Sequence, residues 1–428
     1  HTFTAGSTID AFANQVSHFG VSFYQPIGYF RYLNGSIDQV RIYNTALTQS
    51  QVTELYNETQ ASASTLNFPT GAGGKTLYEF NNDATSTSSS SYNGSATNVT
   101  YDSFLFKPDL VIIKARNSDF NWSWTDTVRG AGNFLMSNFT DANIVNENSI
   151  TAFNNAGFTL GTGVKSGTAN SNGFNKVNDN YVAYSFKMLD NNNNVPIVMD
   201  GGTVDSLVSA NPSAGMSVVK FTNAANGTST VSHGLSSVPE LIIMKQIDAA
   251  TNWVSYNVDG GAGRTLILNN TNAYSANNAS VQWGSVPTSS LFTVTNNSSL
   301  TNGSKPHIAY CFHSVSGFSK IGTYEWTATS YTVGTCVTGL GFSPDFVIIK
   351  RINAAGNWQV YGSERGSGDQ RYALYFDDDD AESTDGYQAI KFDSNGFSTL
   401  ESADGHITGG SGINEKDGIY LYWAMKIN

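Results

Sequence analysis

The sequence has few charged residues: Asp, Glu, Lys and Arg make up 13% of its 428 residues, against about 25% in an average soluble domain. The 22 Lys and Arg are outnumbered by 34 Asp and Glu, which gives a formal charge of −12. A surface that binds nucleic acid phosphates needs clustered cations. The composition therefore disfavours nucleic acid as a partner.

Cysteine is nearly absent, with only Cys311 and Cys336. Two cysteines cannot form a disulfide framework, and one bridge between them is the most that the sequence allows. Cys311 lies where two similar segments, described below, carry Ser185 and Ala424. We therefore expect a reduced, buried, small residue at this position.

Long apolar runs and proline are also scarce. No run of eighteen or more apolar residues occurs, so we expect no membrane-spanning helix. The 9 Pro contrast with 41 Gly, many Asn, Ser and Thr, and 12% aromatic residues. Aromatic and β-branched residues pack well on pleated sheets, while Asn and Gly suit tight turns. The mixture predicts an all-β protein.

Three segments of the sequence align without a gap over 23 residues. Each passes from a proline through a short apolar run to a lysine, and then through Asn-Trp to a glycine. The Lys-to-Trp spacing is eight residues and the Pro-to-Gly spacing is 22 in every copy. Such a short, β-rich run is typical of a strand buried on both faces. The repeated positions are Pro108, Lys114, Trp122 and Gly130; Pro239, Lys245, Trp253 and Gly261; and Pro344, Lys350, Trp358 and Gly366.

These copies predict three tandem β-sandwich repeats, at residues 71–190, 213–316 and 317–428. Each is long enough for seven to nine short strands. Residues 190–214 hold two prolines and a Gly-Gly pair, which predicts an extended connector. Only residues 314–319 separate the second and third repeats, so we expect these two to dock closely.

The first 62 residues differ from the repeats. Residues 35–43 read Gly-Ser-Ile-Asp-Gln-Val-Arg-Ile-Tyr, an alternating strand, and residues 48–51 offer a capping box for a short helix. This strand, turn and helix resemble the closing element of laminin-G-like, concanavalin-type jelly rolls. The resemblance implies that residues 1–62 are the C-terminal part of such a jelly roll, and we expect its other strands upstream of His1.

The repeat is similar to a domain that recurs in virion proteins of tailed phages, marine ones especially. Its first copy keeps Pro-Asp at 108–109, Asp-Thr-Val-Arg-Gly at 126–130 and Gly-Phe-Thr-Leu-Gly at 157–161, whereas Gly260 replaces the arginine in the second copy. The resemblance implies a non-enzymatic appendage on the virion surface, outside the cell: a tail fibre, spike or capsid fibre that acts in host attachment. It brings no catalytic residues.

Catalytic patterns are weak in this sequence. None of the six histidines has metal-ligand spacing, and no Gly-x-Ser-x-Gly elbow occurs. His307 and His313 share one face of a predicted strand, where strand-end polar residues explain them better than a metal site. We therefore expect no enzyme activity and no cofactor, apart from the ion considered next.

One acidic cluster is a weak candidate for Ca²⁺, because hard oxygen ligands on a loop suit that ion. Its spacing is not that of an EF-hand, and a charge run is usually a solvated loop. Its members, followed by Glu382 in the same run, are Asp377, Asp378, Asp379, Asp380 and Asp385.

The repeated tryptophans offer two interpretations, a sugar-stacking platform or a core anchor between the two sheets of a sandwich. Their identical position in three copies favours the anchor. The repeated lysines are expected as strand-end gatekeepers, and Arg129 and Arg365 as partners of a turn carboxylate such as Asp126 or Glu364. Receptor contacts are expected in variable loops such as 166–179 and 377–385.

The partners expected for the chain follow from its edges and from the resemblance. Strand edges and apolar faces would be exposed on an extended monomer, which predicts a homo-oligomer, with a trimer favoured because phage fibres are commonly trimeric. Other virion proteins and a host-surface glycan or protein are the further partners. Two alternatives stay open: a bacterial cell-surface or secreted carbohydrate-binding adhesin, and the non-catalytic part of a polysaccharide-degrading enzyme.

Overall fold

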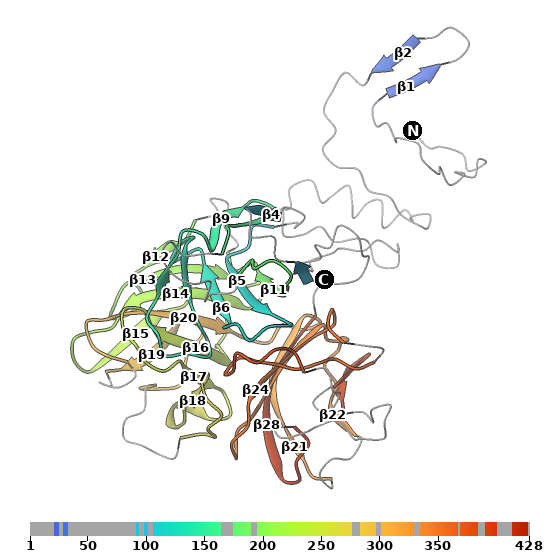
Figure 1. Cartoon of the computed structure of the whole chain (residues 1–428). Coiled ribbons are helices and arrows are strands. Elements are labelled where there is room, and N and C mark those ends of the chain that lie inside the picture. The colour runs from blue at the N-terminus through green and yellow to red at the C-terminus, as the bar shows by residue number, and fades with distance from the viewer. Residues whose placement is uncertain are drawn as a thin grey trace, which may run out of the picture. The chain divides into compact units, whose positions relative to one another are not determined.

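Antiparallel strands dominate the computed structural model of the chain (Figure 1), and no α-helix occurs among the residues that it describes. The expected all-β class is confirmed. The described residues are 98–101, 106–163, 174–189, 195–275, 283–296, 301–328, 334–366, 369–383, 390–399 and 413–426, with the strands at 21–24, 29–32 and 91–93. In this part of the chain no helix could span a membrane.

The chain divides into two compact units, one of residues 1–59 and 67–75 and the other of residues 60–66 and 76–428. In the first unit β1 (Val21–Tyr24) pairs with β2 (Tyr29–Tyr32) as an antiparallel ribbon. The strand expected at residues 35–43 and the helix expected after residue 48 lie outside the described residues. The second unit contains all three repeats.

The first repeat consists of a six-stranded sheet in the order β3-β11-β5-β6-β7-β8 and a three-stranded sheet in the order β4-β10-β9. The strands are β3 (Ser91–Asn93), β4 (Val99–Tyr101), β5 (Leu110–Ala115), β6 (Ser123–Asp126), β7 (Asn133–Leu135), β8 (Ile144–Val145), β9 (Ile150–Asn154), β10 (Gly157–Leu160) and β11 (Asn180–Phe186).

The second repeat has a seven-stranded sheet in the order β12-β13-β14-β20-β16-β17-β18 and the pair β15-β19. The strands are β12 (Ile197–Met199), β13 (Ser206–Asn211), β14 (Met216–Thr222), β15 (Thr228–Ser232), β16 (Leu241–Gln246), β17 (Val254–Asn257), β18 (Leu266–Ile267), β19 (Leu291–Thr295) and β20 (Pro306–Phe312), with a 3₁₀ turn, η2 (Gly261–Gly263). The expectation of an extended connector at 190–214 is wrong for most of its length, because β12 and β13 hydrogen-bond into this sheet.

The third repeat has a five-stranded sheet in the order β21-β28-β23-β24-β25 and a three-stranded sheet in the order β22-β27-β26. It begins seven residues after β20 ends, as the short join predicts. The strands are β21 (Ser319–Trp326), β22 (Thr335–Thr338), β23 (Phe346–Arg351), β24 (Trp358–Gly362), β25 (Leu374–Tyr375), β26 (Lys391–Asp393), β27 (Gly396–Ser398) and β28 (Gly418–Met425).

The three larger sheets share one pairing pattern. The apolar strand of each copy (β5, β16, β23) lies between the last strand of the repeat and the strand that carries or follows the repeated tryptophan. The register is also shared: equivalent isoleucines of the apolar strands face one position of the last strands. The three pairs are Ile112 with Tyr184, Ile243 with Tyr310, and Ile348 with Trp423.

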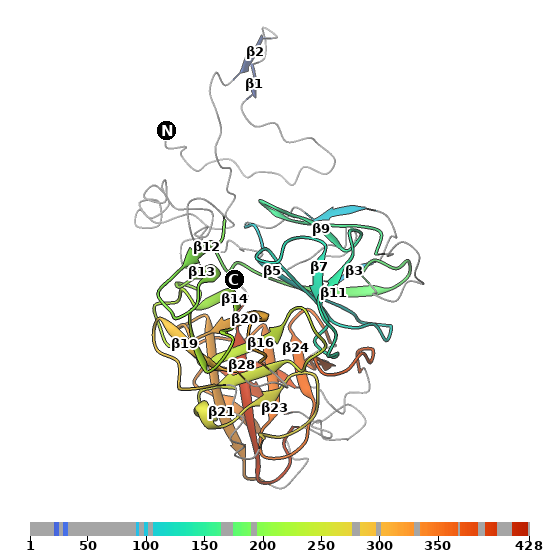
Figure 2. The same ribbon diagram turned by 90° about the vertical axis from the view of Figure 1, so that its left-hand side faces the viewer.

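Four hydrophobic cores hold this unit together. Three of them each belong to one repeat and lie between its larger and smaller sheets. The fourth is shared by the larger sheets of all three repeats, which Figure 2 shows in teal, in green to yellow and in orange to red. In β5, Ile112 points into the shared core and Val111 into the core of its own repeat. This confirms that the apolar run is buried on both faces.

The repeated tryptophans are buried, as expected, with exposed fractions of 0%, 0% and 1% for Trp122, Trp253 and Trp358. Their place differs from the prediction. All three belong to the shared core rather than to the space between the two sheets of one sandwich. The larger sheets have two apolar faces, and the tryptophans lie on the face turned towards the other repeats.

Both cysteines are free thiols in the described structure. The Cys311 side chain has no exposed surface, so the expected reduced and buried residue is confirmed. Burial raises the pKa of both thiols to about 12. Cys311 therefore acts as a small apolar side chain of β20.

Candidate functional site

The indole N–H of each repeated tryptophan donates a hydrogen bond to a main-chain carbonyl of another repeat. The three acceptors hold equivalent positions, sixteen or so residues after the tryptophan of their own repeat. The bonds run from Trp122 to Tyr375, from Trp253 to Met136 at 2.8 Å, and from Trp358 to Ile267 at 2.9 Å. The first repeat thus bonds to the third, the third to the second and the second to the first, which closes a ring with pseudo-threefold symmetry.

A second set of cyclic bonds runs in the opposite direction. Main-chain N–H groups at one equivalent position donate to the carbonyl that follows the apolar strand of the next repeat. The bonds are Asn143 to Ile247 at 2.7 Å, Tyr274 to Ile352 at 3.1 Å, and Glu382 to Arg116 at 2.7 Å. Each junction between repeats is therefore tied from both sides.

The repeated lysines also lie at these junctions, and the expectation of strand-end gatekeepers is wrong. Lys114, Lys245 and Lys350 have no exposed surface. The Lys114 ammonium donates to the carbonyls of Ala115 and of Asp379 in the third repeat, at 2.8 and 3.1 Å. Burial lowers the pKa of each of the three lysines to about 8. They replace water at carbonyls that the turns leave unbonded.

Arg129 forms a buried network between the first and second repeats. Its guanidinium pairs with Asp126 at 2.7 Å, which confirms the expected turn carboxylate. The Tyr310 hydroxyl of the second repeat donates to the same carboxylate at 2.8 Å and accepts from Arg129 at 3.2 Å. The full exclusion of water makes these charge-assisted bonds strong and expensive to break.

Arg365 forms the matching network between the third and first repeats. Its guanidinium pairs with Glu382 at 2.7 Å and with Glu364, as expected, at 3.2 Å. The Tyr184 hydroxyl of the first repeat donates to Glu364 and accepts from Arg365, both at 3.0 Å. Arg116 of the first repeat adds a second ion pair to Glu382 at 2.7 Å.

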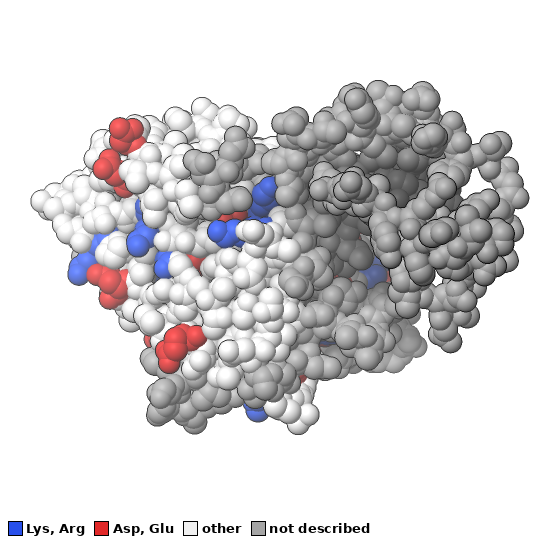
Figure 3. Space-filling model, turned by 90° about the horizontal axis from the view of Figure 1, so that it is seen from above, with Lys and Arg blue, Asp and Glu red and all other residues white. Residues whose placement is uncertain are grey.

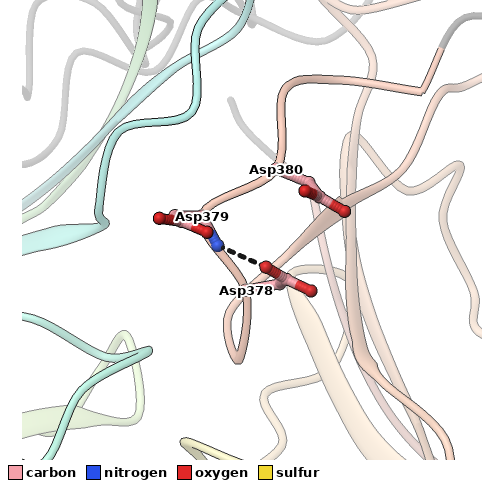
Figure 4. Close-up of side chains that lie close together, drawn as sticks. All are labelled: Asp378, Asp379 and Asp380. Atoms are coloured by element: carbon pink, nitrogen blue, oxygen red, sulfur yellow. Dashed lines mark hydrogen bonds between the residues drawn. The ribbon is translucent and has the colours of Figure 1, made fainter.

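The acidic loop that follows β25 lies beside this junction. Asp378, Asp379 and Asp380 each offer one carboxylate oxygen within 4.8 Å of the others. In Figure 4 the main-chain N–H of Asp379 donates to the Asp378 carboxylate, at 2.8 Å. Ca²⁺–oxygen distances of about 2.3–2.6 Å place two ligands up to about 5 Å apart. The spacing of the three carboxylates therefore fits one cation.

An open hollow of about 440 Å³ adjoins this acidic loop. It lies between the first and third repeats, because Asp119 belongs to one and all its other lining residues to the other. Those residues are Asn357, Tyr375, Asp378, Asp380, Ala381 and Ser383. The hollow is thus lined by carboxylates, a hydroxyl and an amide, with one aromatic residue.

Two carboxyl groups of the loop have raised pKa values for different reasons. The neighbouring Asp378 carboxylate raises the pKa of Asp380. Burial raises the pKa of Asp377 to about 6. Asp377 accepts the main-chain N–H of Trp358 at 2.8 Å, so it caps the repeated motif and is not grouped with the three neighbouring carboxylates. Asp385 lies outside the described residues.

The other expected positions fall into place as structural residues. The His307 ring is buried, stacks on Phe221 at 5.4 Å and bonds to the Lys305 carbonyl at 2.9 Å. His313 bonds to the Ser314 carbonyl at 2.9 Å. Among the described residues, the one group suited to a metal contains neither histidine.

The expected recognition loop at 166–179 is only in part outside the described residues. Its last part is not a free loop: Phe174 and Asn175 have no exposed surface, and Asp179 is 6% exposed. Phe174 packs into the core of the first repeat, edge-on against Phe134. The expectation of an exposed loop is therefore wrong for residues 174–179.

Sequence reasoning missed the tyrosines that complete the two arginine networks. Tyr184 and Tyr310 hold one equivalent position, and the third repeat has Trp423 there. This alternation was visible in the aligned last strands. Its meaning depends on contacts between repeats, which a single aligned unit does not contain.

The geometry defines a class: an all-β protein whose three homologous sandwiches close into a ring around a shared core. A family model matches residues 82–426, a single span that covers all three repeats. The chain belongs to the family described as Domain of unknown function (DUF7483). No curated protein and no solved structure matched the chain.

Proposed function

We propose that this protein is a non-enzymatic structural and adhesive appendage of a tailed-phage virion, a tail fibre, spike or capsid fibre that acts in host attachment. The observation that carries the proposal is the cyclic closure of three repeats. The ring buries its strongest polar groups, Arg129 and Arg365 with their carboxylates, in junctions between repeats. Such an arrangement suits a rigid scaffold that presents its loops.

The described surface supports contact through polar side chains rather than through tryptophan. All seven Trp in the sequence are at most 4% exposed, so none is a sugar-stacking platform. On the face in Figure 3, Lys and Arg are sparse and interspersed with Asp and Glu. A host glycan contacted by carboxylates, hydroxyls and amides fits these properties, and the hollow beside Asp378 and Asp380 offers such groups.

Self-association remains part of the proposal, on a changed basis. The apolar faces that suggested a trimer of chains are covered within one chain by the shared core. The edge strand β12 remains, with Ile197 and Val198 50% and 70% exposed. We propose that copies associate through this edge, next to other virion proteins on the outside of the particle, because exposed apolar edges favour strand pairing.

Mass spectrometry of purified phage particles tests the proposed location. We expect peptides of this chain at a fixed ratio to the major capsid protein after density-gradient purification. Peptides found instead in the bacterial envelope or the culture medium would contradict the virion location and favour the adhesin. Light scattering of the intact protein tests self-association: a mass above that of one chain supports it, and a monomer contradicts it. Val198→Lys should abolish it, with Val286→Lys, on an exposed residue outside β12, as the control.

A further inference from the structure

Four positions meet at each junction between repeats. Three belong to one repeat: the end of the strand after the apolar strand, the place three residues later, and the place whose main-chain N–H donates to the next repeat. The fourth is the position in the last strand of the next repeat that faces the equivalent isoleucine. The four read Asp126, Arg129, Asn143 and Tyr310; Gly362, Arg365, Glu382 and Tyr184; and Asn257, Gly260, Tyr274 and Trp423.

The first two junctions reach the same contact by different residues. Asn143 accepts from the Arg129 guanidinium at 2.8 Å, and Glu382 takes that role for Arg365 at 2.7 Å. Where the first repeat has Asp126, the third has Gly362. A Cβ at Gly362 would lie 2.2 Å from the Glu364 carboxylate, so Glu364 fills the space that Asp126 fills in the first repeat. The compensation maintains one arrangement: guanidinium, carboxylate and the hydroxyl of the next repeat.

The third junction has lost the arginine and the facing hydroxyl together. A Cβ at Gly260 would lie 2.9 Å from the Tyr274 ring, so the tyrosine ring occupies the space beside Gly260. The Tyr274 hydroxyl bonds to Asn257, within its own repeat. The facing position of the third repeat is Trp423, which packs on Phe312 of the second repeat at 4.2 Å. An aromatic contact replaces the charged one.

We propose that these four positions specify which repeat packs beside which, so that the ring closes in a single cyclic order. In the reversed order, Trp423 would face the Arg129 pocket, where an indole cannot accept from the guanidinium. Tyr184 would face Gly260 and Tyr274, where its hydroxyl has no guanidinium. Only Tyr310, placed at Arg365, would still match. Buried charged groups without partners make the wrong order unfavourable.

A transplanted junction tests the proposal in the full chain. Asn257→Asp, Gly260→Arg and Tyr274→Asn together give the second repeat the residues of the first, and Gly260 has φ −74°, which any residue adopts. We expect this triple variant to lower the Tm while Trp423 is present. Adding Trp423→Tyr should raise the Tm of the triple variant, although the same change lowers the Tm of the wild type. An equal loss from Trp423→Tyr in both backgrounds would overturn the proposal.

A second cycle keeps the test decisive if the triple variant does not fold. Tyr310→Phe should lower the Tm of the wild type clearly and that of Arg129→Met much less, because the hydroxyl loses its partner in either variant. Tyr256→Phe, in the core of the second repeat, is the matched control and should cost the same in both backgrounds. Equal costs of Tyr310→Phe in both backgrounds would show that the two residues do not act as a pair.

Discussion

Trp253 has two roles that a sequence alignment of single repeats cannot separate. Its ring fills the shared core, beside Trp124 at 5.5 Å, and its N–H joins the second repeat to Met136 of the first. We expect Trp253→Ala to lower the free energy of unfolding by about 3–5 kcal/mol, the usual loss for a large core aromatic. Urea unfolding followed by circular dichroism measures it.

The control for Trp253→Ala is Phe139→Ala, because the Phe139 side chain is 42% exposed. This substitution should change the free energy of unfolding by less than about 0.5 kcal/mol. A loss at Trp253 no larger than that at Phe139 would contradict the role of the tryptophan as an anchor of the junction.

The buried lysines predict an unusual dependence of stability on pH. Burial lowers the pKa of Lys245 to about 8 in the folded protein, from an ordinary value of 10.5. Between these values the unfolded chain binds more protons, so stability rises with pH. Relative to Lys245→Met, the wild type should gain on the order of 1–3 kcal/mol between pH 7 and pH 10. Urea unfolding at several pH values measures the difference.

Lys320→Met is the control for this pH series, since Lys320 is exposed on β21. Its difference from the wild type should not vary with pH over the same interval. If the wild type instead lost stability relative to Lys245→Met as the pH rose, the carbonyls around the ammonium would favour its charged form more than burial disfavours it.

The central strands show how far sequence reasoning reaches. Uninterrupted apolar residues at 241–244 predicted burial on both faces, and every residue of β16 is buried. The pattern could not say what covers the second face, because any apolar layer satisfies it. The same gap explains the repeated lysines: a lysine at a strand end suggests solvent, and only the neighbouring turn shows that Lys245 is enclosed by carbonyls.

The connector was mistaken for a related reason. Paired glycines and prolines at 196–212 are typical of linkers, yet β12 and β13 lie between them and extend the sheet of the second repeat. In β13 the polar residues Ser206, Ser209 and Asn211 are buried, and this obscures the alternation that marks a half-buried strand. The acidic loop was found from its sequence, whereas its separation into a capping Asp377 and three grouped carboxylates required the fold.

The strand β20 carries a thiol that its surroundings protect. Cys311 lies opposite Ser217 and Ile242 on the two neighbouring strands and has no exposed surface. Burial favours its neutral form, so the thiolate needed for reaction is scarce. We expect no reaction of either cysteine with Ellman's reagent in the native protein and two equivalents after unfolding. Rapid modification of the native protein would contradict this.

The three sandwiches were predicted as separate units along the chain, but the shared core makes them depend on one another. We expect them to unfold in one cooperative transition, because no repeat can leave without exposing the inner faces of the other two. Tryptophan fluorescence follows this transition selectively, since all seven indoles lie in the three repeats. Separate transitions for single repeats in calorimetry would contradict the shared core as the main stabilising element.

The ring of three unequal repeats has a consequence for counting. A homotrimer is needed to place three like surfaces around an axis when each chain supplies one. This chain supplies all three, since its indole bonds already run from the first repeat to the third, from the third to the second and from the second to the first. A single copy can therefore cap a threefold axis, and because its repeats differ, it gives that axis three distinguishable sides.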